Sequence, residues 1–232
     1  MSLLHLVRHG QASAGSANYD QLSPIGEEQS QILGNWWLSH GFSPNAAYHG
    51  TLVRQRDTAI HSLAAITDNE QAPTMGEHSG LNEYNHRVIE SHFCSEHADY
   101  EPESMGFEDY MGILSRWRDY QPDKSAVDDD SGDHEIERWD DFKARGWNTL
   151  KALSHQGSDG GEFVFFTSGG IIATVVSTIL DLDFEHTVDA IWRIRNTSIT
   201  TIHLSGNNAR LVEFNTVPHL QEQRKPHLIT LI

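Results

Sequence analysis

The order of segments along the chain predicts an α/β fold of three layers, in which helices cover both faces of a mostly parallel central sheet. Two observations carry this prediction. Short apolar runs of strand length alternate with segments of helical periodicity over residues 3–66 and again over residues 137–214. Between them lies an irregular acidic tract, 84–137, which we expect to form an inserted lid or cap within a single domain spanning 1–232.

Local signals place the first elements. Residues 3–7 form an apolar strand that ends at Arg8. Ser23-Pro24 begins a helix, because serine is a good N-cap and proline at the first helical position gives up an N–H that has no partner there. Residues 46–48 then indicate a short strand and 52–66 a helix, and a strand-like segment closes at Glu83.

Regular patterns return after the acidic tract. A helix over 137–153 is followed by a buried strand over 162–167, rich in aromatic and β-branched residues, and by an apolar helix over 171–180. Residues 197–204 and 209–214 predict a terminal hairpin. Inside the tract, 107–118 favours one helix, and the run 128–130 of three aspartates indicates a solvated loop because it lacks calcium-loop spacing.

Composition limits the partners of the protein. The chain carries 33 acidic residues against 16 Lys and Arg, a formal net charge of −17. Such a surface repels nucleic acid and anionic membranes, so we expect neither as a partner. The single cysteine, Cys94, excludes an intrachain disulfide and disfavours a thiolate zinc site. The sequence shows neither a signal peptide nor an apolar run of about 18 residues, which favours a cytoplasmic protein.

The most informative segment is Arg8-His9-Gly10, where the first strand ends. In open α/β sheets, ligand sites gather at the carboxyl ends of strands. The planar fork of an arginine there suits an anionic oxygen group, and a histidine can act as a nucleophile or a proton carrier. The segment therefore predicts an anion site, against the alternative of an ordinary strand that ends in a polar turn.

Three further segments predict parts of the same site. Arg54 lies in the first turn of the second helix, where the helix dipole disfavours a cation, so it either serves an anion or pairs with Asp57 on the surface. Glu83 is either a catalytic acid or a solvated carboxylate. The turn Ser168-Gly169-Gly170 before a helix offers backbone N–H groups to an anion, or needs its glycines for packing alone.

Together these segments resemble the histidine phosphatase superfamily, also called the phosphoglycerate mutase-like family. The resemblance covers most of the chain, and its signature is Arg8-His9-Gly10. Glu83 falls where this family places its proton donor. The matching segments are 6–10, 22–26 with Gln29, 52–59, 163–170, 196–200 and 214–220.

The resemblance implies a phosphatase for a small phosphorylated substrate. His9 would attack phosphorus and become phosphohistidine, which water would then hydrolyse. Arg8 and Arg54 would hold the equatorial oxygens, and Glu83 would protonate the leaving alcohol. No metal or other cofactor is implied, since the arginines supply the positive charge. The remaining phosphate contacts are expected from neutral groups in the two turns: Gln11, Ser13, Ser168 and Gly169.

One position departs from the family pattern. The family carries a second histidine directly before the Gly-Gly turn, and this chain has Ser168 there. Losing one transition-state donor typically costs about 10²–10³ in rate. Three outcomes stay open: a slower phosphatase, a phosphatase that recruits His86 or His219 instead, or a catalytically impaired protein that binds phosphorylated ligands.

Two other activities are weaker alternatives. A mutase needs extra basic groups for a second acidic group of its substrate; His86 and Arg87 are available, but the surrounding tract is acidic. A serine hydrolase built on Ser168 is disfavoured because Phe166 stands where the nucleophile elbow requires glycine. It would also leave the Arg8-His9-Gly10 segment unexplained.

Overall fold

A computed structural model gives the architecture of the protein and describes residues 1–13, 20–67, 73–94, 106–121, 136–155 and 160–231. It divides the chain into two compact units, residues 1–83 with 146–232, and residues 84–145. The second unit begins at Tyr84, where we placed the start of the insertion, and ends eight residues beyond the expected boundary. The aspartate run 128–130 lies outside the described residues.

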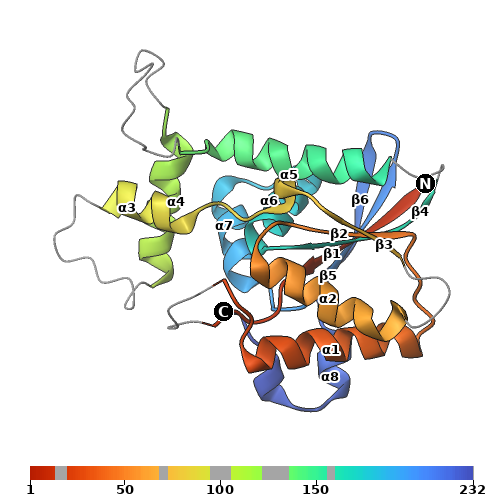
Figure 1. Ribbon diagram of the computed structural model, residues 1–232. Helices are drawn as coiled ribbons and strands as arrows, with labels where there is room; N and C mark the ends of the chain where they lie inside the picture. The colour runs from red at the N-terminus through yellow and green to blue at the C-terminus, as the bar shows by residue number, and fades with distance from the viewer. Residues whose placement is uncertain (14–19, 68–72, 95–105, 122–135, 156–159, 232) are drawn as a thin grey trace. The chain divides into compact units, whose positions relative to one another are not determined.

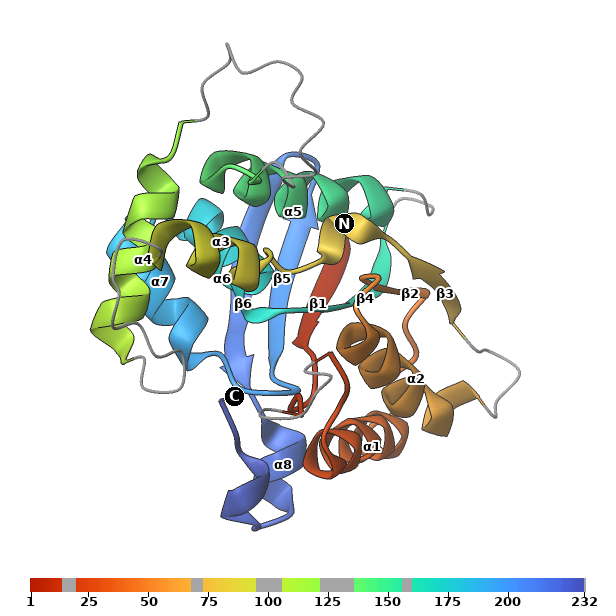
Figure 2. The ribbon, with the colours of Figure 1, turned by 60° about the vertical axis from the view of Figure 1, so that its left-hand side comes forward.

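A six-stranded sheet in the order β3-β2-β4-β1-β5-β6 forms the centre of the first unit. β1 and β2 both run parallel to β4, and β3 is parallel to β2, whereas β5 is antiparallel to β1 and to β6. Figure 2 shows β1, β5 and β6 side by side. The expected mostly parallel sheet is therefore confirmed. The strands are β1 Ser2–Arg8, β2 Ala46–His49, β3 Thr74–Glu77, β4 Gly161–Thr167, β5 Ile199–Ser205 and β6 Asn208–Thr216.

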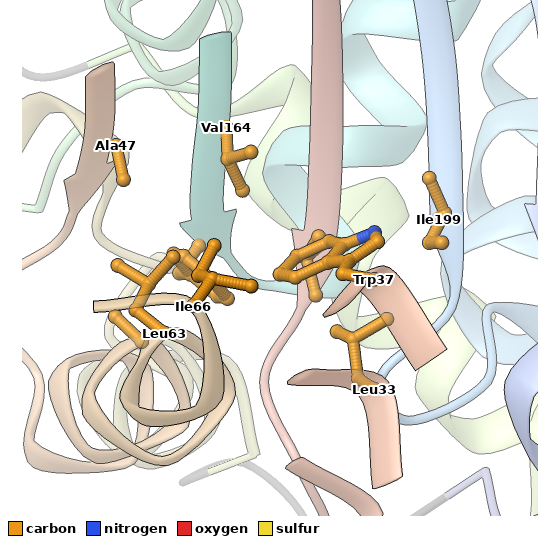
Figure 3. Packing of buried hydrophobic residues seen from close by; sticks show 10 residues of the cluster. Leu33, Trp37, Ala47, Leu63, Ile66, Val164 and Ile199 are labelled. Atoms are coloured by element: carbon orange, nitrogen blue, oxygen red, sulfur yellow. The ribbon is translucent and has the colours of Figure 1, made fainter. Parts of the chain in front are cut away.

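Helices α1 (Pro24–Ser39) and α2 (Val53–Thr67) lie side by side on one face of the sheet (Figure 1). Val164 projects from β4 toward them and belongs to one buried cluster with Trp37 of α1 and Leu63 of α2 (Figure 3). All three side chains are almost completely buried, so this layer of the core carries much of the hydrophobic stabilisation of the unit. It also fixes the start of α2 beside the carboxyl end of the sheet.

The other face of the sheet is covered by α6 (Gly169–Leu180), which contacts β1 and β6 and packs against α7 (Phe184–Arg193). α6 begins two residues before the predicted start, directly at the glycine turn. Sequence patterns missed α7, whose first turn is capped by the Asp183 carboxylate through its bond from His186 N. Three short helical elements complete the unit: η1 Ser79–Leu81, α8 Pro218–Glu222 and η3 Pro226–Leu228.

The second unit contains α3 (His86–Cys94), α4 (Phe107–Asp119) and the first part of α5 (Trp139–Ser154). Its core is aromatic: the Trp117 ring lies 4.9 Å from the Tyr84 ring and 5.1 Å from the Trp139 ring. The predicted helix over 107–118 is α4. The described part of this unit is therefore a small packed body of its own.

Candidate active site

The carboxyl ends of β1, β4 and β2 are neighbours in the sheet and point in one direction, so the residues that follow them meet at one edge. Arg8 ends β1 opposite Thr167 of β4. His9 and Ser168 are the next residues along the two strands. The strand order thus places the Arg8-His9-Gly10 segment beside the turn of residues 168–170, the two segments for which the sequence most strongly predicted a role in the site.

His9 is 4 % exposed and has both ring nitrogens engaged. Arg54 Nε donates to His9 Nε2 at 3.2 Å, and His9 Nδ1 lies 2.8 Å from Gly10 O. A guanidinium can only donate, so Nε2 is the acceptor and the proton sits on Nδ1, which donates to the carbonyl. Burial, followed by the charges of Arg54 and Arg8, lowers the pKa of His9 well below its usual 6.5. The imidazole is therefore neutral, with its Nε2 lone pair turned toward an arginine.

The loop after β1 is held from two sides. Gly10 N donates to Thr58 Oγ1 of α2 at 2.9 Å, and Asn196 Nδ2 donates to His9 O at 3.1 Å. A Cβ on Gly10 would lie 2.5 Å from Gly26 O of α1, so residue 10 has to be glycine for this close approach. The position of His9 is thus set by α1, α2 and the segment before β5.

Arg54 is 6 % exposed and joins His9 to a carboxylate that the sequence did not indicate. Its Nη1 lies 2.6 Å from Asp20 Oδ1, and the other oxygen of Asp20 accepts from Val53 N at 2.9 Å. Asp20 thereby offsets the unfavourable position of a cation in the first turn of α2. The surface pair of Arg54 with Asp57, considered above, is wrong: Asp57 pairs with Arg56 at 2.8 Å. No local spacing links Asp20 to α2.

Arg8 and Glu83 both contact the turn between β4 and α6. A Cβ on Gly169 would lie 3.8 Å from Arg8 Nε, so the guanidinium lies against this turn, and its Nη1 donates to Ile194 O and Leu231 O. Glu83 Oε2 accepts a hydrogen bond from Gly170 N, in the first turn of α6, at 2.9 Å. The prediction that Glu83 closes a strand is wrong. The strand β3 ends at Glu77, and Glu83 follows η1.

Gln11 and Ser13, the two polar residues expected to contact phosphate, form hydrogen bonds toward α1. Gln11 Oε1 accepts from Ser23 Oγ at 2.8 Å, and Ser13 Oγ donates to Leu22 O at 3.0 Å. Ser23 also caps α1 by accepting from Gly26 N, as its sequence position predicted. Gln11 and Ser13 therefore link the loop of His9 to the first turn of a helix.

Ser168 is fully buried and accepts a hydrogen bond from Gln55 Nε2 at 2.8 Å. Of its two expected substitutes, His86 belongs to the other unit. His219 is buried with Nε2 3.0 Å from Thr197 Oγ1, and burial lowers its pKa to about 3, so it carries no charge near neutral pH.

Sequence reasoning missed His49, which ends β2 and is 5 % exposed. Its Nδ1 lies 2.7 Å from Gly50 O, the same contact that His9 makes with Gly10. The His-Gly pair repeated at the ends of two strand-like segments, at residues 9–10 and 49–50, is a signal that the sequence contains and that could have identified His49.

Metal ligands and membrane-spanning helices were both sought in the structure. Within the described ranges, no three His, Cys, Asp or Glu side chains gather in a way that would hold a metal ion. None of the described helices combines the length and apolar character needed to cross a bilayer.

A mostly parallel sheet brings a neutral histidine and two arginines to its carboxyl edge, which is where open α/β proteins place their ligand sites. The model of the histidine phosphatase superfamily (branch 1) matches residues 4–217. The chain therefore belongs to this superfamily, as its motifs indicated. A search of curated proteins finds no match.

Solved structures share the fold at low identity. YhfR of Bacillus stearothermophilus is 17 % identical, with 95 % of this chain and 100 % of that one covered and a TM-score of 0.66. A phosphoglycerate mutase from Bacillus anthracis str. Sterne is 16 % identical, with 97 % of each chain covered and a TM-score of 0.65. Phosphoserine phosphatase from Entamoeba histolytica, in complex with 3-phosphoglyceric acid, is 19 % identical, with 95 % and 100 % covered and a TM-score of 0.60.

Proposed function

We propose that the protein hydrolyses a small phosphomonoester through a phosphohistidine at His9. The observation that carries this proposal is the pair formed by His9 and Arg54. The Nε2 atom of a neutral, immobilised imidazole faces a guanidinium at 3.2 Å, and Gly10 O holds the proton on the opposite nitrogen. This arrangement provides a neutral nucleophile whose Nε2 electron pair accepts from Arg54 until a phosphoryl group takes that place, and it keeps a cation beside the phosphorus that Nε2 attacks.

In the first step, the Nε2 electron pair forms the bond to phosphorus while the bond to the leaving oxygen breaks. Arg54 and Arg8 stabilise the negative charge on the equatorial oxygens. Glu83, in its protonated form, gives its proton to the leaving alcohol. In the second step the Glu83 carboxylate takes a proton from water, whose oxygen attacks phosphorus and releases phosphate and neutral His9.

The comparisons support a small phosphorylated substrate without naming it. Two of the similar structures are complexes of the Entamoeba histolytica phosphoserine phosphatase, one with phosphoserine and one with 3-phosphoglyceric acid. The neighbours also include a mutase, so transfer to a second acceptor is the alternative outcome of the same phosphohistidine. Hydrolysis is favoured here because the two cations whose charges act on His9, Arg54 and Arg8, match the charge of a single phosphoryl group.

The test is phosphate release from p-nitrophenyl phosphate by the full chain in the presence of EDTA. We expect turnover in the wild type and its loss in His9→Ala, whereas His61→Ala on the body of α2 keeps it. Denaturation in alkali, which preserves phosphohistidine, followed by mass spectrometry should find the phosphoryl group on His9. Turnover that survives in His9→Ala would refute the mechanism. Phosphate binding without turnover would instead favour a ligand-binding protein.

A further inference from the structure

Gln55 is a fully buried polar residue next to Arg54 on α2. Its Nε2 donates to Leu81 O at 3.1 Å and to Ser168 Oγ at 2.8 Å. A backbone carbonyl can only accept, so the bond to Leu81 fixes which end of the amide is the nitrogen. Both amide protons are then committed, and Ser168 Oγ has to be an acceptor toward Gln55.

The Ser168 hydroxyl consequently keeps its own proton for another partner. A serine hydroxyl has one donor and two acceptor positions, and Gln55 uses one of the acceptors. Leu81 O offers no alternative, because it accepts from Thr167 Oγ1 at 2.6 Å as well as from Gln55. Across the described residues, the Ser168 hydroxyl donates to no acceptor. Its proton is available to an oxygen bound at the turn that Arg8 and Glu83 also contact.

We propose that Gln55 is a positioning residue that makes Ser168 a hydrogen-bond donor to a phosphoryl oxygen, so that the site recognises phosphate at this position with a neutral hydroxyl. The inference rests on the proposed function, since it assigns a ligand atom to that same site. Arg8 and Arg54 then supply the positive charge, and the hydrogen bond from Ser168 fixes the position of one phosphoryl oxygen.

Gly50 belongs to the same arrangement. A Cβ at this position would lie 1.8 Å from Gln55 Oε1 and 2.5 Å from Asn82 Oδ1, far inside contact distance. Glycine therefore allows the Gln55 amide to lie between the end of β2 and Ser168. The amide in turn limits residue 168: a side chain longer than serine that leaves the backbone in the same direction meets Gln55 Nε2.

The first experiment is a double-mutant cycle on the full chain with p-nitrophenyl phosphate. Ser168→Ala removes the donor and should lower kcat by about 10²–10³-fold. Gln55→Met keeps the volume, and Leu81 O keeps its bond from Thr167, so the fold survives while kcat falls. The double variant should be no worse than Ser168→Ala, because Gln55 acts through Ser168.

The matched control is Ser62→Ala, which removes a fully buried hydroxyl of α2 seven residues after Gln55 and should leave kcat unchanged. Thermal unfolding of each variant checks that it is folded. If Gln55→Met keeps the wild-type kcat, or if the two single losses multiply in the double variant, Gln55 does not act through Ser168 and the proposal is wrong.

A second experiment uses pH, which a purely structural role would not affect. Ser168→His with Gln55→Ala replaces the neutral donor by an imidazole and makes room for it. We expect kcat/KM of this double variant to gain an alkaline limb near the ordinary histidine pKa of about 6.5, absent from the wild type. Ser168→His alone should be far less active, because the ring meets the amide. Equal activity of the single and double variants would overturn the proposal.

Binding of inorganic vanadate by calorimetry separates this proposal from the proposed function. If the chain binds vanadate but shows no turnover, hydrolysis fails as the function. The inference then stands if Gln55→Met weakens binding and fails if it does not. If turnover is present and independent of Gln55, the inference alone fails.

Discussion

His9 is held by two partners that make opposite demands on its ring: Arg54 Nε needs an acceptor, and Gly10 O needs a donor. One tautomer satisfies both. Burial disfavours a charged ring, and protonation of Nε2 would also place a second positive charge against Arg54, so the pKa of His9 lies well below 6.5. The proposed nucleophile therefore keeps its neutral form in mildly acidic solution.

The corresponding prediction is a titration of His9 in the free protein. Because a lowered pKa shifts protonation to lower pH, His9 should remain the neutral Nδ1–H form as pH falls through 6.5. Arg54→Ala removes the second-largest cause of the shift and should raise the pKa. Nitrogen NMR of labelled imidazole reads both the tautomer and the titration. Protonation of wild-type His9 at or above 6.5 would contradict this account.

Arg54 makes its two contacts through different nitrogens, and this geometry gives a second prediction. Its Nε reaches His9 while Nη1 reaches Asp20. A lysine ammonium is a single point and cannot hold both positions. We expect Arg54→Lys to lower kcat by about 10²-fold, the lower end of the cost of one lost transition-state donor. Arg56→Lys, an exposed neighbour paired with Asp57, is the matched control. Equal kcat values for both variants in steady-state kinetics would show that the two simultaneous contacts of Arg54 are not needed.

At the scale of elements, local patterns predicted what depends on neighbours in the chain. Ser23 was identified as the cap of α1, and the run 162–167 as a buried strand, because capping and strand composition are local properties. The Arg54–Asp20 and Gln55–Ser168 contacts join residues 34 and 113 positions apart. Hydrophobic periodicity does not reveal contacts between residues so far apart. The sequence therefore indicated Arg54 and Ser168 but not Asp20 and Gln55, which form hydrogen bonds with them.

The C-terminal segment is another long-range element, and it supports the loop of His9. Thr230 Oγ1 donates to Asn196 Oδ1 at 2.8 Å and accepts from Gln29 Nε2 at 2.8 Å. Asn196 in turn donates to His9 O, and Gln29 Oε1 accepts from Gln11 N. Hydrogen bonds thus connect Thr230 and Gln29 of α1 to both sides of the loop that carries His9.

Thr230→Val tests this network with a side chain of the same shape. It leaves Asn196 Oδ1 buried without its donor, so we expect the free energy of unfolding to fall by about 1–3 kcal/mol. We also expect a lower kcat, because Asn196 holds His9. Urea unfolding and kinetics measure the two effects. Ser39→Ala, an exposed hydroxyl at the end of α1, should change neither; a Thr230→Val protein with wild-type stability would show that the network is dispensable.

At the scale of the molecule, the sequence predicted the α/β class because alternating strands and helices leave few alternatives. It placed the insertion by its loss of periodicity, and a compact unit does begin at Tyr84. The helix α7 was missed although the sequence contains its signals: Asp183 is a good N-cap, and Phe184, Val188 and Ile191 follow with helical spacing. Composition alone also gave no sign that several of the fifteen histidines are buried.

Those buried histidines make the stability of the whole molecule depend on pH. Burial lowers the pKa of His5 to about 4 and that of His219 to about 3. Between these values and the unfolded value near 6.5, the unfolded chain binds protons that the folded chain does not. The free energy of unfolding must therefore fall as pH decreases below 6.5, and each such proton contributes a slope of about 1.4 kcal/mol per pH unit.

His219→Gln removes one of these protons, so the slope of unfolding free energy between pH 6 and 4 should decrease by about 1.4 kcal/mol per unit. The slope decides the matter, because it is independent of any constant loss of stability that the substitution causes. Urea unfolding at a series of pH values measures it. His155→Gln, at a residue exposed to solvent in the folded chain, should leave the slope unchanged. If His219→Gln leaves it unchanged as well, His219 takes up its proton while the chain is still folded, and the acid sensitivity of the molecule has another source.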